Sequence, residues 1–319
     1  MNNSTLPILF ILLSTFALSC KSDQISDVHE PDVVVETELL EDVRYLSSDE
    51  LNGRRTGEEG NRMAGEYIEE RFQSLELQMA GESYRHLFDF TNSQTGEEFV
   101  EAVNLIGFIE GSANPNRFIV VTAHYDHLGV SNGDIYNGAD DNASGTGGLL
   151  AAARYFSENR PENNILFIAF DAEEQGLSGA RYFIENPAIP LNQIVLNVNM
   201  DMISNNFDNE LYAVGTAHYP FLSPFIMESV SDASITVSFG YDTDDWPQNW
   251  TMSSDHGPFH QQGIPFVYFG VEDHPQYHQP SDTFENINPD FYLEAVETII
   301  GVIEKFDNNL DEIAELANE

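Results

Sequence analysis

Basic residues are scarce in this sequence, and cysteine is almost absent. The chain has 12 lysines and arginines, of which only Lys21 and Lys305 are lysines, against 54 aspartates and glutamates, so its formal net charge is −42. Such an acidic surface repels phosphates and anionic lipid headgroups, which excludes nucleic acid as a partner and membrane binding through surface charge. The single cysteine, Cys20, excludes an intramolecular disulfide.

Two explanations of this acidity remain open. In saline surroundings the Debye length is short and self-repulsion is weak, so a highly acidic protein is tolerated there. Alternatively, the negative potential attracts cationic substrates. No obligatory protein partner is indicated by either explanation.

The N-terminus is expected to be a targeting segment rather than part of the fold. Ile8–Leu18 is apolar but too short to span a bilayer, and it is followed closely by Cys20. Small residues before a cysteine resemble a bacterial lipoprotein signal, although Met1–Pro7 has no Lys or Arg; an ordinary secretory signal is the alternative. Either signal predicts an exported protein, and the first predicts a lipid anchor at Cys20 on a bacterial membrane. The expected domains are a signal peptide (1–19), a lipidated cysteine with a flexible tether (20–35), and a single domain with an N-terminal helical segment (36–319).

Apolar runs alternate with helical patterns along most of the chain, which is typical of an α/β protein. The strand-like runs include Ala102–Ile109, Phe118–Thr122, Ile165–Phe170, Ile194–Val198 and Phe266–Phe269. The expected helices that follow them are Gly147–Ser157, Leu177–Glu185, Pro220–Ser231 and Pro289–Phe306. We expect a mixed, mainly parallel sheet flanked by helices on both faces, with the first two runs paired with each other. A chain of 319 residues that is 41% hydrophobic can form one such domain.

Acidic residues and histidines follow several of these runs. His124, Glu173 with Glu174, Asp201 and His278 each come at or shortly after the end of an apolar run, and Asp141 precedes an alanine-rich helix. In open α/β sheets, ligands bind at the carboxyl ends of strands. Carboxylates gathered at that edge would repel one another unless one or two divalent metal ions were bound between them.

Each of these residues also has a simpler explanation. Asp126 is placed to accept the second N–H of the His124 imidazole or to brace the adjoining loop. Asp141 is either a residue that caps a helix N-terminus or a carboxylate that bridges two cations. Glu173 and Glu174 are either solvated loop residues or a base and a metal ligand side by side.

Taken together, the motifs resemble those of peptidase family M28, the co-catalytic di-zinc aminopeptidases, over about residues 40–310. The segments Tyr45–Leu51 and Gly53–Gly57 also resemble a common N-terminal segment of this family. The resemblance implies a mixed sheet flanked by helices and two Zn²⁺ ions per chain. It implies the following roles: His124 and Asp201 on one zinc, Glu174 and His278 on the other, Asp141 between them, Glu173 as general base, Tyr277 as oxyanion stabiliser, and Asp126 as a further catalytic residue.

Substrate recognition is harder to infer from the sequence. Ser254–Phe259 resembles a family segment that lines the substrate pocket, so Asp255, His256 and Phe259 are expected to bind substrate. Several relatives have an arginine where Ser253 stands. Aromatic residues including Trp246 and Trp250 form either a pocket wall or core. Acidic residues at 242–245 attract an ammonium group, bind calcium or are solvated, and His127, His256 and His274 are expected in supporting roles.

The family resemblance implies an aminopeptidase that removes residues from peptides with a free N-terminus, through a water held between the metals. Other reactions of the same fold are alternatives: a carboxypeptidase, a dipeptidase or a glutaminyl cyclase, the last of which works with a single zinc. A catalytically silent binding lipoprotein is a further alternative. The full set of five ligands and the base argues against the last two.

Overall fold

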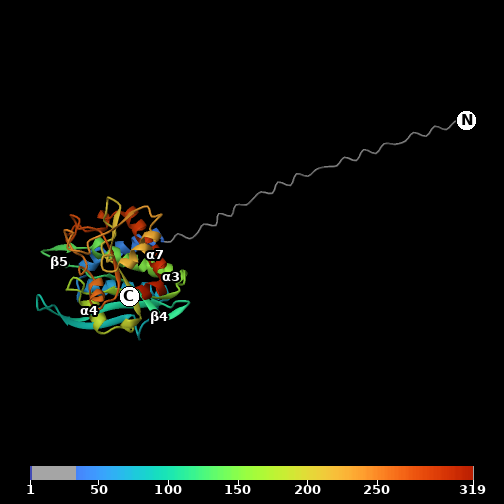
Figure 1. Ribbon diagram of the computed structural model, residues 1–319. Coiled ribbons are helices and arrows are strands. Elements are labelled where there is room, and N and C mark those ends of the chain that lie inside the picture. Colours follow the sequence, from blue (N-terminus) through green and yellow to red (C-terminus); the bar gives the residue numbers. More distant parts are fainter. Residues whose placement is uncertain (2–33, 319) are drawn as a thin grey trace. The chain divides into compact units, whose positions relative to one another are not determined.

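A nine-stranded mixed sheet forms the centre of residues 34–318, which together with Met1 are the residues that this computed structural model describes (Figure 1). In spatial order the strands are β1 (Gln78–Met79), β3 (Glu98–Ile109), β7 (Asn163–Phe170), β4 (Asn114–His124), β8 (Ile194–Met200), β11 (Phe266–Gly270), β9 (Glu210–Val214) and β10 (Thr236–Phe239), with β2 (Arg85–Thr91) also paired to β3. The central strands β7, β4, β8 and β11 are parallel. β3 and β9 are antiparallel to them, so the predicted mixed sheet is confirmed, with parallel pairing in its centre and between β9 and β10.

Helices cover both faces of this sheet, as predicted. Along β7, Ile165, Phe167 and Ala169 pack into one apolar cluster, whereas the alternate residues Leu166 and Phe170 pack into another. Successive side chains of a strand point to opposite faces, so each cluster is the core on one side. The first core is covered by α1 (Glu36–Leu46), α2 (Glu59–Ser74), α3 (Gly145–Glu158), α5 (Ser223–Ser229), α7 (Pro289–Asp307) and α8 (Leu310–Leu316), and the second by α4 (Ser178–Glu185) and α6 (His256–Gln261).

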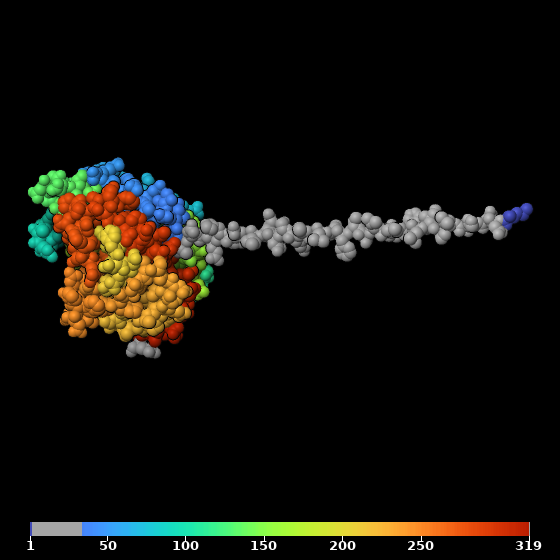
Figure 2. All heavy atoms as spheres, turned by 90° about the horizontal axis from the view of Figure 1, so that it is seen from above, coloured from blue at the N-terminus to red at the C-terminus, as the bar shows by residue number. Residues whose placement is uncertain are grey.

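The longest helix, α7, shows why these segments are helical. Its start has two stabilising features: Pro289 at the first position, and the side chain of Asn288, which accepts a hydrogen bond from the Phe291 N–H. Phe291, Ala295, Ile299 and other residues at helical spacing are buried. On the surface, α1 lies beside the segment that precedes α7, where the Arg44 guanidinium is 3.8 Å from the centre of the Phe284 ring (Figure 2).

The predicted pairing of the first two strand-like runs is wrong. β3 and β4 do not pair, because β7 lies between them and pairs with both. The chain leaves β4, passes through α3 and returns as β7, a crossover that places two successive parallel strands side by side. Every residue of β7 is buried, as expected for a strand with neighbours on both sides and helices on both faces.

The targeting segment predicted for residues 1–19, and Cys20, lie outside the described residues apart from Met1. The same is true of the predicted tether except for its last two residues. No helix within residues 34–318 is long and apolar enough to cross a membrane.

Candidate metal centre and active site

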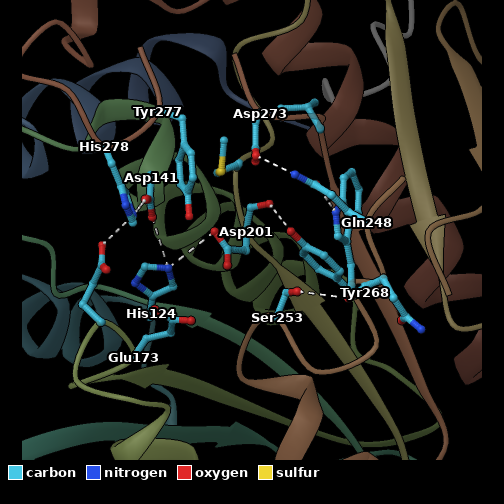
Figure 3. A pocket seen from close by; sticks show the side chains of 15 residues that line it. His124, Asp141, Glu173, Asp201, Gln248, Ser253, Tyr268, Asp273, Tyr277 and His278 are labelled. Atoms are coloured by element: carbon cyan, nitrogen blue, oxygen red, sulfur yellow. Dashed lines mark hydrogen bonds and ion pairs between the residues drawn. The ribbon is translucent and has the colours of Figure 1, made fainter. Parts of the chain in front are cut away.

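Loops at the carboxyl ends of the parallel strands bring the predicted metal ligands together around one cavity of about 260 Å³ (Figure 3). His124 is the last residue of β4, Asp201 follows β8, and Glu174 follows β7 by four positions. Asp141 lies in the turn that precedes α3, and His278 lies in the loop after β11. Residues far apart in the sequence therefore meet because parallel strands end at the same edge of the sheet.

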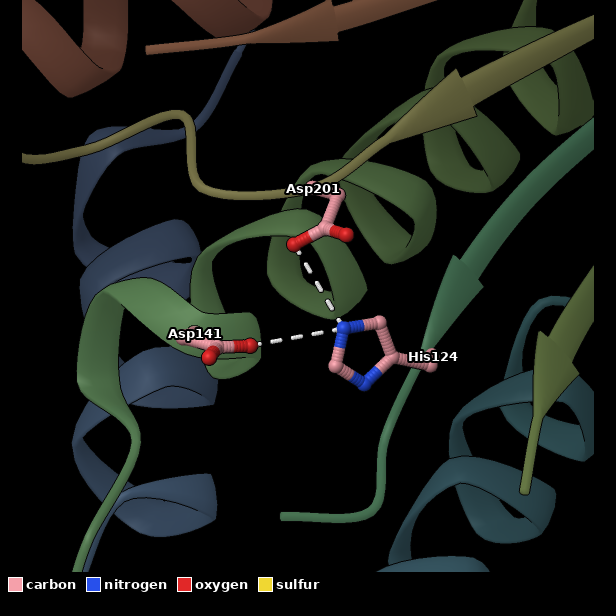
Figure 4. A group of neighbouring side chains, drawn as sticks. All are labelled: His124, Asp141 and Asp201. Carbon is pink, nitrogen blue, oxygen red and sulfur yellow. Dashed lines mark ion pairs between the residues drawn. The ribbon is translucent and has the colours of Figure 1, made fainter. Parts of the chain in front are cut away.

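The first group of ligand atoms contains His124, Asp141 and Asp201 (Figure 4). The His124 Nε2 atom is 3.4 Å from Asp141 Oδ1 and 3.4 Å from Asp201 Oδ1. Burial alone would lower the pKa of His124, but the carboxylates of Asp201 and Glu173 outweigh it and raise that pKa well above its ordinary value. The imidazole is thus held in a field that favours a cation.

The second group contains Glu174, His278 and the other oxygen of Asp141. The His278 Nε2 atom is 3.0 Å from Asp141 Oδ2 and 3.5 Å from Glu174 Oε1. Burial would raise the pKa of Glu174, but the nearby His127 and His278 side chains lower it below its usual range. Asp141 directs one oxygen to each group, which is the arrangement expected of a carboxylate between two cations.

The side chains present fit divalent metal ions. Imidazole nitrogens and carboxylate oxygens are common zinc ligands, and two sets of three ligand atoms each lie within 4.8 Å of one another: those of His124, Asp141 and Asp201, and those of His127, Asp141 and Glu174. In the second group the Glu174 Oε1 atom is buried and has no hydrogen-bond partner. A buried polar atom without a partner requires an explanation, and a bound ion is one of the few available.

Hydrogen bonds to the backbone fix the turn that carries Asp141. The Asp282 carboxylate accepts the N–H groups of Asp140 and Asp141 at 2.9 and 3.0 Å. The Asn142 amide donates to the Met200 carbonyl at 3.0 Å and so ties the turn to the end of β8. A Cβ atom at Gly145 would lie 2.4 Å from that same carbonyl, so only glycine lets α3 begin this close to Asp201.

Two roles were considered for Asp126, and the geometry favours the one in which its carboxylate stabilises the loop that carries Glu173 and Glu174. Its carboxylate accepts the backbone N–H groups of Glu173 and Glu174 at 3.0 and 3.3 Å. The His124 Nδ1 atom lies 3.2 Å from the Asp126 carbonyl but 3.6 Å from its nearer carboxylate oxygen. Asp126 therefore orients the base candidate and one ligand through their main chain.

Glu173 and Tyr277 both line the cavity beside the ligands. Burial, together with the charges of Glu174, Asp201 and Asp255, raises the pKa of Glu173 well above its ordinary value, although His124 acts against this. The Tyr277 ring stacks on His278 with centroids 4.0 Å apart, and its hydroxyl points between Asp141 and Asp201 (Figure 3). A carboxylate with a raised pKa suits a general base, and a hydroxyl there suits a hydrogen-bond donor.

The structure does not place Asp255, His256 and Phe259 in the cavity wall, where they were expected to bind substrate. All three are fully buried behind it. Phe259 packs against Phe183 in the core on the α4 side, because α6 turns its apolar side chain away from the cavity. His256 contacts the Trp250 carbonyl at 2.9 Å, and its pKa is lowered to about 4 by burial.

The remainder of the cavity wall was largely missed by the sequence analysis. It consists of Met202, Gln248, Asn249, Trp250, Ser253, Tyr268, Val271 and Asp273. Trp250 had been considered as pocket wall, and proximity to the segment around Ser254 could have suggested its neighbours in this set. The acidic residue Asp242 is buried and accepts the N–H groups of Gly215 and Ala217, so it stabilises a loop rather than facing substrate.

Comparisons with known proteins agree with this geometry. The model of peptidase family M28 matches residues 104–303. Aminopeptidase YwaD of Bacillus subtilis is 33% identical over 194 residues, which cover 58% of this chain and 40% of that protein. The chain spans between 27% and 50% of the length of curated relatives of this kind.

Solved structures share the fold at low sequence identity. BSAP, a zinc aminopeptidase from Bacillus subtilis, has a TM-score of 0.66 at 19% identity and covers 84% of this chain and 94% of its own. A glutaminyl cyclase from Bacteroides thetaiotaomicron has a TM-score of 0.69 at 17% identity and covers 85% of this chain and 98% of its own. The same fold therefore occurs with two different reactions.

Proposed function

This chain belongs to peptidase family M28, and from that premise we propose that it is a zinc-dependent aminopeptidase. The observation that carries the proposal is the charge of the cavity beside the ligand groups. Within the described part of the chain, its lining has neither lysine nor arginine, and Asp273 is its one charged side chain besides the proposed metal ligands and Glu173. A peptide enters such a site more favourably by its ammonium terminus than by its carboxylate terminus.

Two zinc ions are part of the proposal. His124, Asp141 and Asp201 would hold one, and Asp141, Glu174 and His278 the other. Bound there, zinc would lower the pKa of water towards ~7 and polarise the scissile carbonyl. The three carboxylates of these groups then balance most of the charge of two divalent ions.

The residues of the chain supply the remaining steps. Glu173 takes a proton from the attacking water at its carboxylate and delivers it to the departing amine. Asp126 keeps this carboxylate in place through the backbone N–H of Glu173. Tyr277 donates a hydrogen bond to the oxygen of the substrate carbonyl as negative charge develops on it.

The charged residues of the cavity also argue against a carboxypeptidase and a glutaminyl cyclase. A carboxypeptidase needs a cation to hold the terminal carboxylate of its substrate, and Ser253 stands where several relatives have arginine. A glutaminyl cyclase that works with one zinc would not need the first ligand group. Here that group is complete, since Nε2 of His124 faces both Asp141 and Asp201.

The test uses purified protein and four versions of one peptide, with its amine free or acetylated and its C-terminus free or amidated. We expect about two zinc ions per chain and release of the first residue only when the amine is free, with no effect of amidation. Dependence on a free carboxylate would establish a carboxypeptidase instead. Loss of ammonia from a glutamine N-terminus without hydrolysis would establish a cyclase. If no peptide reacted at all, the protein would be a binding protein.

Export and lipid attachment at Cys20 are a separate part of the proposal, supported by the apolar run Ile8–Leu18 and the small residues Ala17 and Ser19 before the cysteine. Mass spectrometry of the mature protein should find a diacylated cysteine as its first residue. Replacement of Cys20 by serine should release the protein from the membrane fraction. A mature N-terminus elsewhere, without lipid, would contradict the anchor.

A further inference from the structure

His127 lies within the second ligand group, although the sequence analysis gave it only a supporting role. Its side chain is fully buried. The Nδ1 atom is 2.8 Å from Glu174 Oε1 and 3.7 Å from Asp141 Oδ2, the same two oxygens that surround the Nε2 atom of His278. The two imidazole rings have centroids 5.8 Å apart, and a nitrogen of each approaches this same pair of oxygens.

The length of this contact is that of a hydrogen bond, but its geometry is not that of a well-aligned one. Neither ring nitrogen of His127 has a hydrogen-bond partner, and neither has Glu174 Oε1, despite the short distance between them. By contrast, His274 Nε2 forms a hydrogen bond of 2.9 Å with Asp140 Oδ2 close by. His127 Nδ1 and Glu174 Oε1 lie close together without the alignment of a hydrogen bond. Two ligands of one metal ion have this relation, because each directs its lone pair at the ion rather than at the other ligand. Ligands of a tetrahedral zinc with bonds of ~2.0–2.1 Å are roughly 3.3 Å apart.

The main chain holds the His127 ring in this position. The His127 N–H donates to the Arg54 carbonyl at 3.2 Å. Gly138 packs flat against the ring, and a Cβ atom there would lie 2.6 Å from its Cγ and Cδ2 atoms. With a φ of +59° that favours glycine, residue 138 leaves the space that the imidazole fills. The ring is therefore fixed beside Glu174 before any ion binds.

We propose that His127 is a ligand of the metal that Glu174 and His278 hold, an inference that rests on the proposed function for the presence of that metal. The ion on this side then has four protein ligands, whereas the ion beside His124 and Asp201 has three. Four protein ligands close a tetrahedral zinc site, and three leave one position open for water or substrate. The open position therefore lies on the side of Asp201, which adjoins the cavity wall at Met202 and Tyr268.

X-ray absorption at the zinc edge tests this assignment on the full chain loaded with two zinc ions, because it counts imidazoles around the metal. We expect three imidazoles per two ions in the unmodified protein and two in His127→Ala. In a zinc titration, the same substitution should raise the dissociation constant of the tighter site by more than ~100-fold. A residue that only hydrogen-bonds a ligand typically changes affinity 10- to 100-fold and would leave the imidazole count unchanged.

Two imidazoles per two ions in the unmodified protein would overturn the assignment, even if His127→Ala failed to fold. His278→Ala should remove one imidazole and calibrates the count. His218→Ala is the matched control, since this exposed histidine contacts only Thr251 and its aromatic neighbours and should leave the count unchanged. Peptide cleavage is measured on the same samples. If the protein is active but has two imidazoles per two ions, only the assignment of His127 as a ligand is refuted. If it is inactive but has three imidazoles per two ions, only the proposed function is refuted.

Discussion

Glu173 is the residue whose replacement separates catalysis from metal binding. Glutamine has the same size and keeps the backbone N–H that Asp126 accepts, so the loop should retain its shape. It cannot accept a proton from water, and general-base catalysis contributes about 10²–10⁴-fold to rates. We therefore expect Glu173→Gln to reduce kcat by at least ~100-fold while both zinc ions remain bound, as measured by steady-state kinetics and metal analysis.

Glu185→Gln is the control for this substitution, because Glu185 is exposed at the end of α4 and does not line the cavity. It should change neither kcat nor metal content. If Glu173→Gln lost zinc in parallel with activity, Glu173 would be a ligand rather than the base. If it kept full activity, another group would have to take the proton.

At the residue scale, the sequence was most informative where a polar residue ends an apolar run. His124 and Asp201 each end such a run, the family resemblance implied that they share one metal, and the structure places His124 Nε2 3.4 Å from Asp201 Oδ1. Their metal-binding role itself remains a prediction. His127 and Asp282 carry no such signal. Their positions depend on backbone groups of other loops, such as the Asp141 N–H that Asp282 accepts, and these are set only when the chain has folded.

Between α1 and the strand ends, the segment Asp49–Arg54 joins several elements through one buried side chain. The Arg54 guanidinium is 1% exposed and donates to the carbonyls of Tyr125, Asn137 and Gly138 at 2.6–2.9 Å, and also to that of Leu46. No carboxylate within 4.0 Å pairs with it in the described residues, and burial lowers its pKa to about 10, so it stays charged at neutral pH. It lies below the loops that carry the ligands and offsets part of their negative charge.

Replacement of Arg54 by methionine should leave the buried carbonyls of Leu46, Tyr125 and Asn137 without donors and remove this charge, whereas the Gly138 carbonyl still accepts the Ala143 N–H. Each such loss costs about 1–3 kcal/mol, so we expect about 3–9 kcal/mol in total and a fall in Tm of roughly 10 °C. Arg54→Lys should recover only a small part, because one ammonium group cannot reach four carbonyls. Thermal denaturation followed by circular dichroism measures both variants.

The neighbouring Arg55 provides the matched control. Its guanidinium is partly exposed and pairs with Glu97 at 2.7 Å, a surface ion pair that contributes about 0–1 kcal/mol. Arg55→Met should therefore shift Tm by no more than a few degrees. Equal shifts for the two arginines would show that burial and the four carbonyl contacts of Arg54 do not matter to stability.

Elements were predictable where periodicity and length agreed, as for the long helix α7. Spatial order was not, because β3 and β4 are neighbours in sequence but flank β7 in the sheet. Two other elements also escaped: α6 has only six residues, and β2 has an irregular burial pattern in which Phe88 alone is buried. Contacts between distant segments decide both the order of the strands in the sheet and the secondary structure of such segments.

Charge is distributed over the whole molecule rather than gathered at the cavity. Exposed carboxylates occur on helices that cover the sheet, for example Glu41, Glu70, Glu228 and Glu312. Arginines offset only some of them; Arg62, for instance, contacts both Glu59 and Glu66. With a net charge of −42, self-repulsion must oppose folding at low ionic strength.

Sodium chloride should therefore stabilise the protein. The Debye length falls from about 30 Å at 0.01 M salt to about 3 Å at 1 M, which removes most repulsion between separate surface charges. If this relieves about 2 kcal/mol, Tm should rise by roughly 5 °C. Sucrose of equal osmolality is the control for effects unrelated to charge.

The alternative explanation, attraction of cationic substrates, predicts a different result. Salt would then lower kcat/KM for peptides with N-terminal lysine relative to kcat/KM for peptides with N-terminal leucine, and Tm would stay constant. Because the carboxylates are spread over the surface, we expect Tm to respond and that ratio to change less than twofold.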